Sequence, residues 1–229
     1  MDFLITKGFV VSNILIVESE NDKYFIEAFL KHMNLNLEVG EPICSISDYE
    51  CLGGIDKLEQ KLKFVRVKTQ KKSIDKVGII FDADSIGVET RKSEIEEKIE
   101  LIFGKKEDRE IEFLPFILNI NGYGELEDIL KIIKTEESIF ADCLSSWREC
   151  LEENEKVITD KVFNKFWVNN YIMYDTCTSS KHRGNKSKYC IFEYAIKEKK
   201  IWNFDHEILD DLKEFLKIIG ANNDNTTSD

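Results

Sequence analysis

The chain has 229 residues, of which 32 are basic and 44 acidic, so its formal net charge is −12. This balance excludes a uniformly basic nucleic-acid coat protein, although a local basic patch could still bind a polyanion. Because 42% of the residues are hydrophobic and only two are proline, we expect a folded core and no long disordered linker.

The first part of the chain alternates between apolar runs rich in Ile and Val and segments with helical spacing of apolar residues. The expected strands cover residues 13–19, 42–49, 77–82 and 113–120. The expected helices cover residues 20–34, 53–70, 87–104 and 125–134. Such alternation predicts an α/β fold with a parallel, Rossmann-like sheet that is flanked by helices on both faces.

The rest of the chain has helical periodicity only. The expected helices there cover residues 137–152, 157–174, 186–199 and 206–219. We expect their aromatic residues to bury surface, namely Trp147, Phe163, Phe166, Trp167, Tyr171 and Trp202. The predicted organisation is an α/β domain (1–135), a C-terminal helical region packed on it (136–220) and a disordered tail (221–229).

No segment approaches the roughly 20 apolar residues of a membrane span, and the N-terminus lacks the pattern of a signal peptide. The cysteines lie at positions 44, 51, 143, 150, 177 and 190, and no pair has the spacing of a zinc knuckle. We therefore expect a cytoplasmic protein without membrane association, whose thiols are reduced and mostly buried.

Acidic residues follow three of the predicted strands. Glu18 follows the first, Asp82 and Asp84 follow the third, and "NGYGELEDIL" after the fourth offers Glu125, Glu127 and Asp128. Ligands of open parallel sheets bind at the carboxyl ends of the strands, so these acids are expected to meet there.

Strand alternation would point Asp82 and Asp84 the same way if the strand continued through both. Carboxylates held this close repel one another unless a cation lies between them, and Mg²⁺ prefers such oxygen ligands. A magnesium site is therefore predicted. The alternatives are that the D-x-D pattern belongs to a turn or a cap and that Glu125 only caps its helix.

The stretches "ILIVESENDKYFIEAFL" and "VGIIFDADSIG" together resemble the Toprim domain. That domain is shared by topoisomerases, bacterial primases, recombination-repair proteins and OLD-family nucleases. Its pattern falls on Glu18, Asp22, the pair Gly53-Gly54, Asp82 and Asp84, with Ser19 where glycine is usual. The resemblance covers roughly residues 12–135, and the whole chain is similar to small stand-alone Toprim-like proteins related to OLD-type nucleases and anti-phage effectors.

The Toprim resemblance implies a nuclease that uses Mg²⁺ or Mn²⁺. Catalysis would rest on Glu18, Asp82 and Asp84, and the metal would be held by Glu18, Asp22, Asp82, Asp84 and Glu127. The resemblance to anti-phage effectors implies DNA or RNA as the substrate, cut internally or from an end, and a partner ATPase or self-association. Two alternatives remain: a non-catalytic Toprim-fold partner subunit and a haloacid-dehalogenase-like phosphatase.

One segment, residues 176–192, contains no acidic residue in an otherwise acidic chain. Its cations are Lys181, Arg183, Lys186 and Lys188, with His182 among them. We expect these lysines and the arginine to bind the phosphates of a nucleic acid. The alternative is a solvated surface turn.

Overall fold

The computed structural model describes residues 13–41, 54–69, 74–177 and 188–221. The predicted strand at 42–49, Gly53, and the cations Lys181, Arg183 and Lys186 with His182 lie outside this part, as does the tail from residue 222. The side chain of Lys188 is likewise not described.

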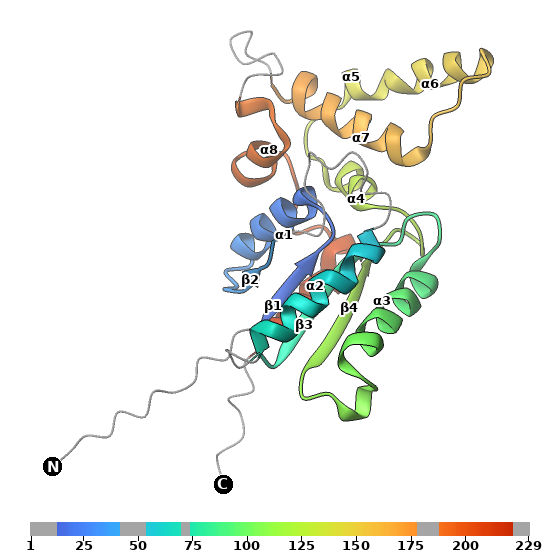
Figure 1. Cartoon of the computed structure of the whole chain (residues 1–229). Coiled ribbons are helices and arrows are strands. Elements are labelled where there is room, and N and C mark those ends of the chain that lie inside the picture. The colour runs from blue at the N-terminus through green and yellow to red at the C-terminus, as the bar shows by residue number, and fades with distance from the viewer. Residues whose placement is uncertain (1–12, 42–53, 70–73, 178–187, 222–229) are drawn as a thin grey trace, which may run out of the picture.

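The predicted α/β class is confirmed by a sheet of four parallel strands in the order β2-β1-β3-β4 (Figure 1). The strands are β1 (Ile14–Val17), β2 (Glu38–Val39), β3 (Lys76–Asp82) and β4 (Glu112–Leu118). The register pairs Ile16 of β1 with Ile79 of β3. The observed β2 lies before the residues that were expected to form the second strand.

Helices cover both faces of the sheet, and each face has its own hydrophobic core (Figure 1). Helices α2 (Gly54–Thr69) and α3 (Val88–Phe103) pack on one face, against side chains such as Ile16 and Ile79. The opposite face is covered by α1 (Glu20–His32) and α9 (Asp210–Gly220). Because successive strand residues point to opposite faces, an unbroken apolar run such as that of β3 supplies both cores.

The remaining helices lie beyond the carboxyl ends of the strands or beside α1 (Figure 1). They are α4 (Leu126–Ile133), α5 (Ile139–Asp142), α6 (Leu144–Glu153), α7 (Asp160–Asn170) with the π-helical segment Tyr171–Asp175, and α8 (Phe192–Glu198). Short 3-10 turns cover Lys106–Asp108, Lys188–Cys190 and Glu207–Leu209. Residues of α4, α7, α8 and α9 belong to the same hydrophobic core as β1 and α1, so the helical region packs directly on the sheet.

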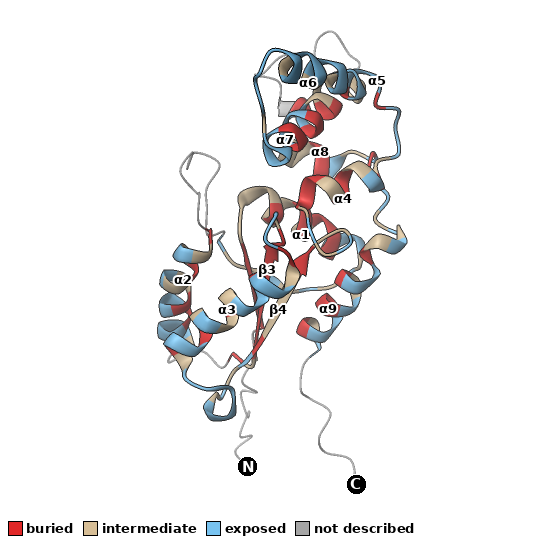
Figure 2. Ribbon diagram, turned by 90° about the vertical axis from the view of Figure 1, so that its right-hand side faces the viewer, coloured by how far each residue is buried: buried red, intermediate tan, exposed pale blue. Residues whose placement is uncertain are grey.

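The aromatic residues of the helical region divide into two groups. Phe163, Trp167, Tyr171 and Trp202 are buried, as the sequence predicted. Trp147 and Phe166 instead remain 40% and 48% exposed and contact each other edge to face, so the prediction was wrong for these two. Helix α6 has no buried residue, which Figure 2 shows as an almost continuous exposed surface. Among the helices of the described part, none is long and apolar enough to span a bilayer.

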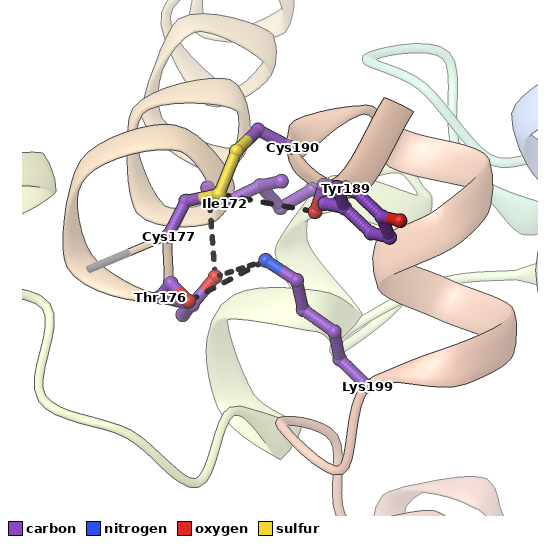
Figure 3. Close-up of a disulfide and its surroundings, with 6 residues drawn as sticks. All are labelled: Ile172, Thr176, Cys177, Tyr189, Cys190 and Lys199. Atoms are coloured by element: carbon purple, nitrogen blue, oxygen red, sulfur yellow. Dashed lines mark hydrogen bonds between the residues drawn. A yellow bond between two sulfur atoms is a disulfide. The ribbon is translucent and has the colours of Figure 1, made fainter. Parts of the chain in front are cut away.

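The prediction of reduced, buried thiols holds only in part for the cysteines that the structure describes: Cys177 and Cys190 are buried but oxidised, and Cys143 and Cys150 are free but exposed. Cys177 and Cys190 form a disulfide with their Cα atoms 5.9 Å apart, and Cys143 and Cys150 are exposed. Figure 3 shows the disulfide between the end of the π-helical segment and the turn before α8. Beside it, the Nζ atom of Lys199 donates hydrogen bonds to Thr176. The two cysteines are 13 positions apart in the sequence, and the fold brings them close enough to form the disulfide.

Replacing Cys177 and Cys190 together by Ser is expected to lower the free energy of unfolding by roughly 2–3 kcal/mol, because the crosslink restricts the unfolded chain. Urea denaturation of the two proteins without reductant measures the difference. A variant with Ser at Cys143 and Cys150 is the matched control, since both side chains are exposed and should leave the urea midpoint unchanged. Equal midpoints for all three proteins would contradict the disulfide.

Candidate functional site

The predicted acids lie around the carboxyl edge of the sheet. Glu18 directly follows β1, Asp82 is the last residue of β3, and Glu125 is the N-cap of α4 beyond β4. Asp22 lies in the first turn of α1. Because β1 and β3 are parallel neighbours, their carboxyl ends are adjacent, which agrees with the expectation that the acids lie at this edge of the sheet.

Glu18 is held against the start of α2. A Cβ atom added to Gly54 would lie 2.6 Å from Oε1 of Glu18, so only glycine lets the helix approach this closely. The Oε2 atom of Glu18 is buried and accepts no hydrogen bond from any residue that the structure describes. Burial, with the neighbouring charge of Asp22, raises the pKa of Glu18 to about 7. A carboxylate in this state is poised to exchange a proton near neutral pH.

Ser19 and Asp22 form a capping box at the start of α1. The backbone N–H of Ser19 donates to Oδ2 of Asp22 at 2.8 Å, and the N–H of Asp22 donates to Oγ of Ser19 at 3.3 Å. Ser19, which replaces the usual glycine of the Toprim pattern, therefore has a local role. Burial raises the pKa of Asp22 to about 6 against the lowering effect of its hydrogen bond from Ser19.

Asp82 is buried, and its carboxylate faces the start of α4. Its Oδ1 atom accepts a hydrogen bond of 3.1 Å from the backbone N–H of Leu126. Burial raises the pKa of Asp82 well above its usual range, and the charges of Asp22 and Glu18 raise it further. Besides burial, the charge of Asp22 raises the pKa of both Glu18 and Asp82, so these three acids lie close together, as the sequence predicted.

Asp84 does not continue the strand, so the condition for it to point the same way as Asp82 by alternation is not met. The strand ends at Asp82, and Asp84 has a left-handed backbone with φ of 49°. Its backbone instead pairs with Gly124 through two hydrogen bonds of 2.8 and 3.0 Å. Its Oδ2 atom lies 2.8 Å from Arg91 and its Oδ1 atom 2.7 Å from Lys161.

The loop between β4 and α4 places Glu125. Gly122 and Gly124 both have positive φ, which lets the chain reverse tightly before the helix. Glu125 is only 3% exposed, and neither carboxylate oxygen accepts a hydrogen bond in the described part. The nearest cation is Lys161, whose Nζ lies 3.9 Å from Oε2. Burial, together with the charge of Glu127, raises the pKa of Glu125 to about 8.

Glu127 and Asp128 have different surroundings. Glu127 is 4% exposed, and its burial raises its pKa despite the opposing charge of Lys165. Asp128 accepts hydrogen bonds from the backbone of Glu125 at 3.0 Å and from the side-chain amide of Asn164 at 2.8 Å. Asp128 therefore fastens α4 to α7, whereas Glu127 belongs to the acidic group.

Three cations that the sequence did not single out face this group. Arg91, which is 9% exposed, donates to the backbone carbonyl of Asp82 at 3.1 Å as well as to Asp84. Lys161 and Lys165 both come from α7. Burial lowers the pKa of Lys161, but its hydrogen bond to Asp84 and the surrounding acids raise it overall. The only sequence signal was the spacing of four between these lysines, which puts them on one helix face.

The site as a whole carries more acids than bases. The acids are Glu18, Asp22, Asp82, Asp84, Glu125 and Glu127, and the bases are Arg91, Lys161 and Lys165. In the part of the chain with described side chains, no three His, Cys, Asp or Glu residues converge closely enough to form a ready ligand set for a metal ion. The donor chemistry of the site suits a hard divalent cation, while Arg91 and Lys161 neutralise part of it.

The fold and site define an α/β protein with an acidic, partly neutralised site at the carboxyl edge of a parallel sheet. By comparison with family models, the chain belongs to the family described as "Protein of unknown function (DUF3226)", whose model matches residues 12–220. Comparisons with curated proteins and with solved structures find no match. The family match spans both the sheet and the helical region, which agrees with their common core.

The raised pKa values of the acids give the metal-free protein a defined pH dependence. Glu125, whose pKa rises from 4.5 to about 8, binds more protons in the folded than in the unfolded protein. Its contribution to stability is therefore fully present below pH 4.5 and is lost as the pH rises through about 8. Replacing Glu125 by Gln should therefore stabilise the protein at about pH 8 by roughly 1–3 kcal/mol and have little effect at about pH 4. Urea denaturation in EDTA at both pH values measures this, and a gain equal at both would contradict the assigned burial.

Proposed function

We propose that this protein is a Toprim-type nuclease of the cytoplasm that hydrolyses phosphodiester bonds of DNA or RNA with Mg²⁺ or Mn²⁺. The observation that carries the proposal is the set of buried carboxylate oxygens of Glu18 and Glu125 that accept no hydrogen bond in the described part. A buried carboxylate without a hydrogen-bond donor is costly, and a divalent cation would compensate several of them at once.

The residues that would hold the metal are those around the edge of β1 and β3. They are Glu18, Asp82 and Asp84, with Asp22 from the Toprim pattern, Glu127 from the acids that follow β4, and Glu125 added from its burial. A divalent ion there would polarise the phosphate and lower the pKa of a bound water. The excess of acids over bases leaves a net negative charge for such a cation to balance.

The chain's own residues have separate tasks in this proposal. Glu18, with its pKa raised to about 7, can accept the proton of the attacking water. Arg91 is a positioning residue, because it holds both the Asp82 carbonyl and the Asp84 carboxylate. Lys161 brings a positive charge beside Asp84, where it complements the charge of a phosphate oxygen.

A second function, a non-catalytic partner subunit with the same fold, is favoured by a different observation. Asp84 is already neutralised by Arg91 and Lys161, as an ion-pair network in a purely structural site would be. In that case Mg²⁺ would neither bind nor stabilise the protein. By resemblance to anti-phage effectors, either function would involve a partner ATPase or self-association.

The test combines a metal titration with a cleavage assay. Thermal melting is followed as Mg²⁺ or Mn²⁺ is added to protein prepared in EDTA, and the same protein is incubated with plasmid, single-stranded DNA and transfer RNA. A metal-dependent rise in melting temperature together with cleavage supports the nuclease. A metal response without cleavage would limit the protein to metal binding, and the absence of both would leave the partner subunit.

A further inference from the structure

A groove lies on the β2 side of the sheet, and none of its lining residues belongs to the acidic site. It has a volume of about 420 Å³ and lies between β1, the residues that follow β2, and α2. Leu15 and Ile16 form part of its floor. The edge strand β2 pairs with only the first half of β1, so the groove opens where the pairing ends.

One face of α2 forms the wall of the groove. Lys57, Lys61, Phe64 and Lys68 lie on this wall, at successive spacings of four, three and four residues. These spacings align side chains on one side of a helix over about 16 Å. The Phe64 ring is 59% exposed, and the Nζ atom of Lys68 lies 5.6 Å from its centroid. The exposed ring therefore offers a flat apolar face with ammonium groups on either side of it along the helix.

The groove is positive within a strongly acidic protein. Its two glutamates are Glu38, which lies 4.0 Å from Lys68, and Glu41, whose carboxylate is already paired with Lys23 at 2.9 Å. The ammonium group of Lys61 donates to the backbone carbonyl of Glu41 rather than to an acid. Three lysines against two glutamates leave an excess of one positive charge among the lining residues, in a chain of net charge −12. A polyanion would therefore concentrate here.

The groove begins next to the acidic site. The first residue of α2, Gly54, packs against Glu18, and Lys57 lies one helical turn further along. The lysines then follow the helix away from the edge of the sheet, so that a strand bound along them would end at Glu18. Figure 1 shows α2 lying along the sheet, with its first turn toward the carboxyl ends of the strands.

We propose that this groove binds single-stranded nucleic acid, with Lys57, Lys61 and Lys68 on the phosphates and Phe64 stacked on a base. Cationic grooves with exposed aromatic side chains are how proteins hold single strands, because every unpaired base offers a face for stacking. A duplex offers no such face without unstacking. The inference deepens the proposed nuclease by assigning its substrate class. It rests on that function only where it says that the groove leads a bound strand toward Glu18.

The experiment measures binding separately from cleavage. Fluorescence anisotropy with labelled single-stranded DNA, single-stranded RNA and duplex DNA is recorded in EDTA over a range of salt. The variants are Phe64→Ala and the triple variant K57A/K61A/K68A. The charge-matched control is K92A/K105A/K106A, because these three lysines are exposed on α3 and in the turn after it, outside the groove. Thermal melting verifies that each variant is folded.

Single strands are expected to bind more tightly than the duplex. Phe64→Ala should weaken their binding about 5- to 150-fold with an unchanged salt dependence. The triple variant should weaken binding and flatten the slope of log affinity against log salt by up to about 2, since each phosphate contact contributes about 0.7. The control should bind like the unmodified protein.

Several results would overturn the groove: no binding of any single strand, preference for the duplex, or equal effects of the triple variant and its control. These results are independent of the proposed activity. If the groove variants bind normally and cleavage persists, the proposed nuclease stands and the proposed binding groove is wrong. If single strands bind through the groove but no metal-dependent cleavage occurs, the binding groove stands and the proposed nuclease is wrong.

Discussion

Replacing Glu18 by Gln is expected to lower the rate of metal-dependent cleavage at least about 100-fold while the protein remains folded. Glutamine keeps the shape that packs against Gly54 but can neither carry the negative charge nor accept a proton. Because the buried Oε2 atom has no hydrogen-bond donor in the described part, the substitution should also raise the melting temperature of the metal-free protein. Initial rates and melting curves of both proteins measure the two effects.

The matched control for this substitution is Glu89→Gln. Glu89 is exposed in the first turn of α3, away from the acidic site, and its replacement by Gln changes the net charge by the same amount. Its cleavage rate should stay close to that of the unmodified protein. If Glu18→Gln and Glu89→Gln behave alike, Glu18 serves only the packing of α2.

Substitutions at Asp82 and Asp84 are expected to shift stability in opposite directions. Asp82→Asn should stabilise the metal-free protein by roughly 1–3 kcal/mol at neutral pH, since the amide oxygen can still accept from Leu126 and no buried carboxyl has to take up a proton. Asp84→Asn should destabilise it by about 1–3 kcal/mol, because Arg91 and Lys161 lose their counter-charge. Urea denaturation in EDTA measures both.

The same two variants test the metal site. Each should lose the rise in melting temperature that Mg²⁺ gives the unmodified protein. The stabilisation by Asp82→Asn should fade as the pH falls below 3.8, the ordinary pKa of this carboxyl, because it is then protonated in both the folded and the unfolded protein. A variant that keeps the full response to Mg²⁺ would remove that residue from the ligand set, and shifts of equal sign would contradict the ion pairs of Asp84.

The sheet could be predicted because its signals are local. A short apolar run rich in Val and Ile, such as residues 77–81, favours a strand buried on both faces, and alternation with helical segments favours parallel neighbouring strands. The predicted bounds differ from β1, β3 and β4 by only one or two residues at each end. The weak point was the edge strand, where β2 comprises only Glu38–Val39.

The sequence by itself indicated that Glu18 and Asp82 would lie at the same edge of the sheet, because parallel strands place their carboxyl ends together. That β1 and β3 are neighbours was decided by the tertiary structure. Only the tertiary structure decided which cations face them. Lys161 is 77 positions from Asp84, and α7 reaches it only because Phe163, Trp167 and the following residues pack into the core of the sheet's other face. Such contacts follow from how whole elements pack, and no local pattern of residues carries that information. The left-handed turn at Asp84 and the disulfide of Cys177 were decided in the same way.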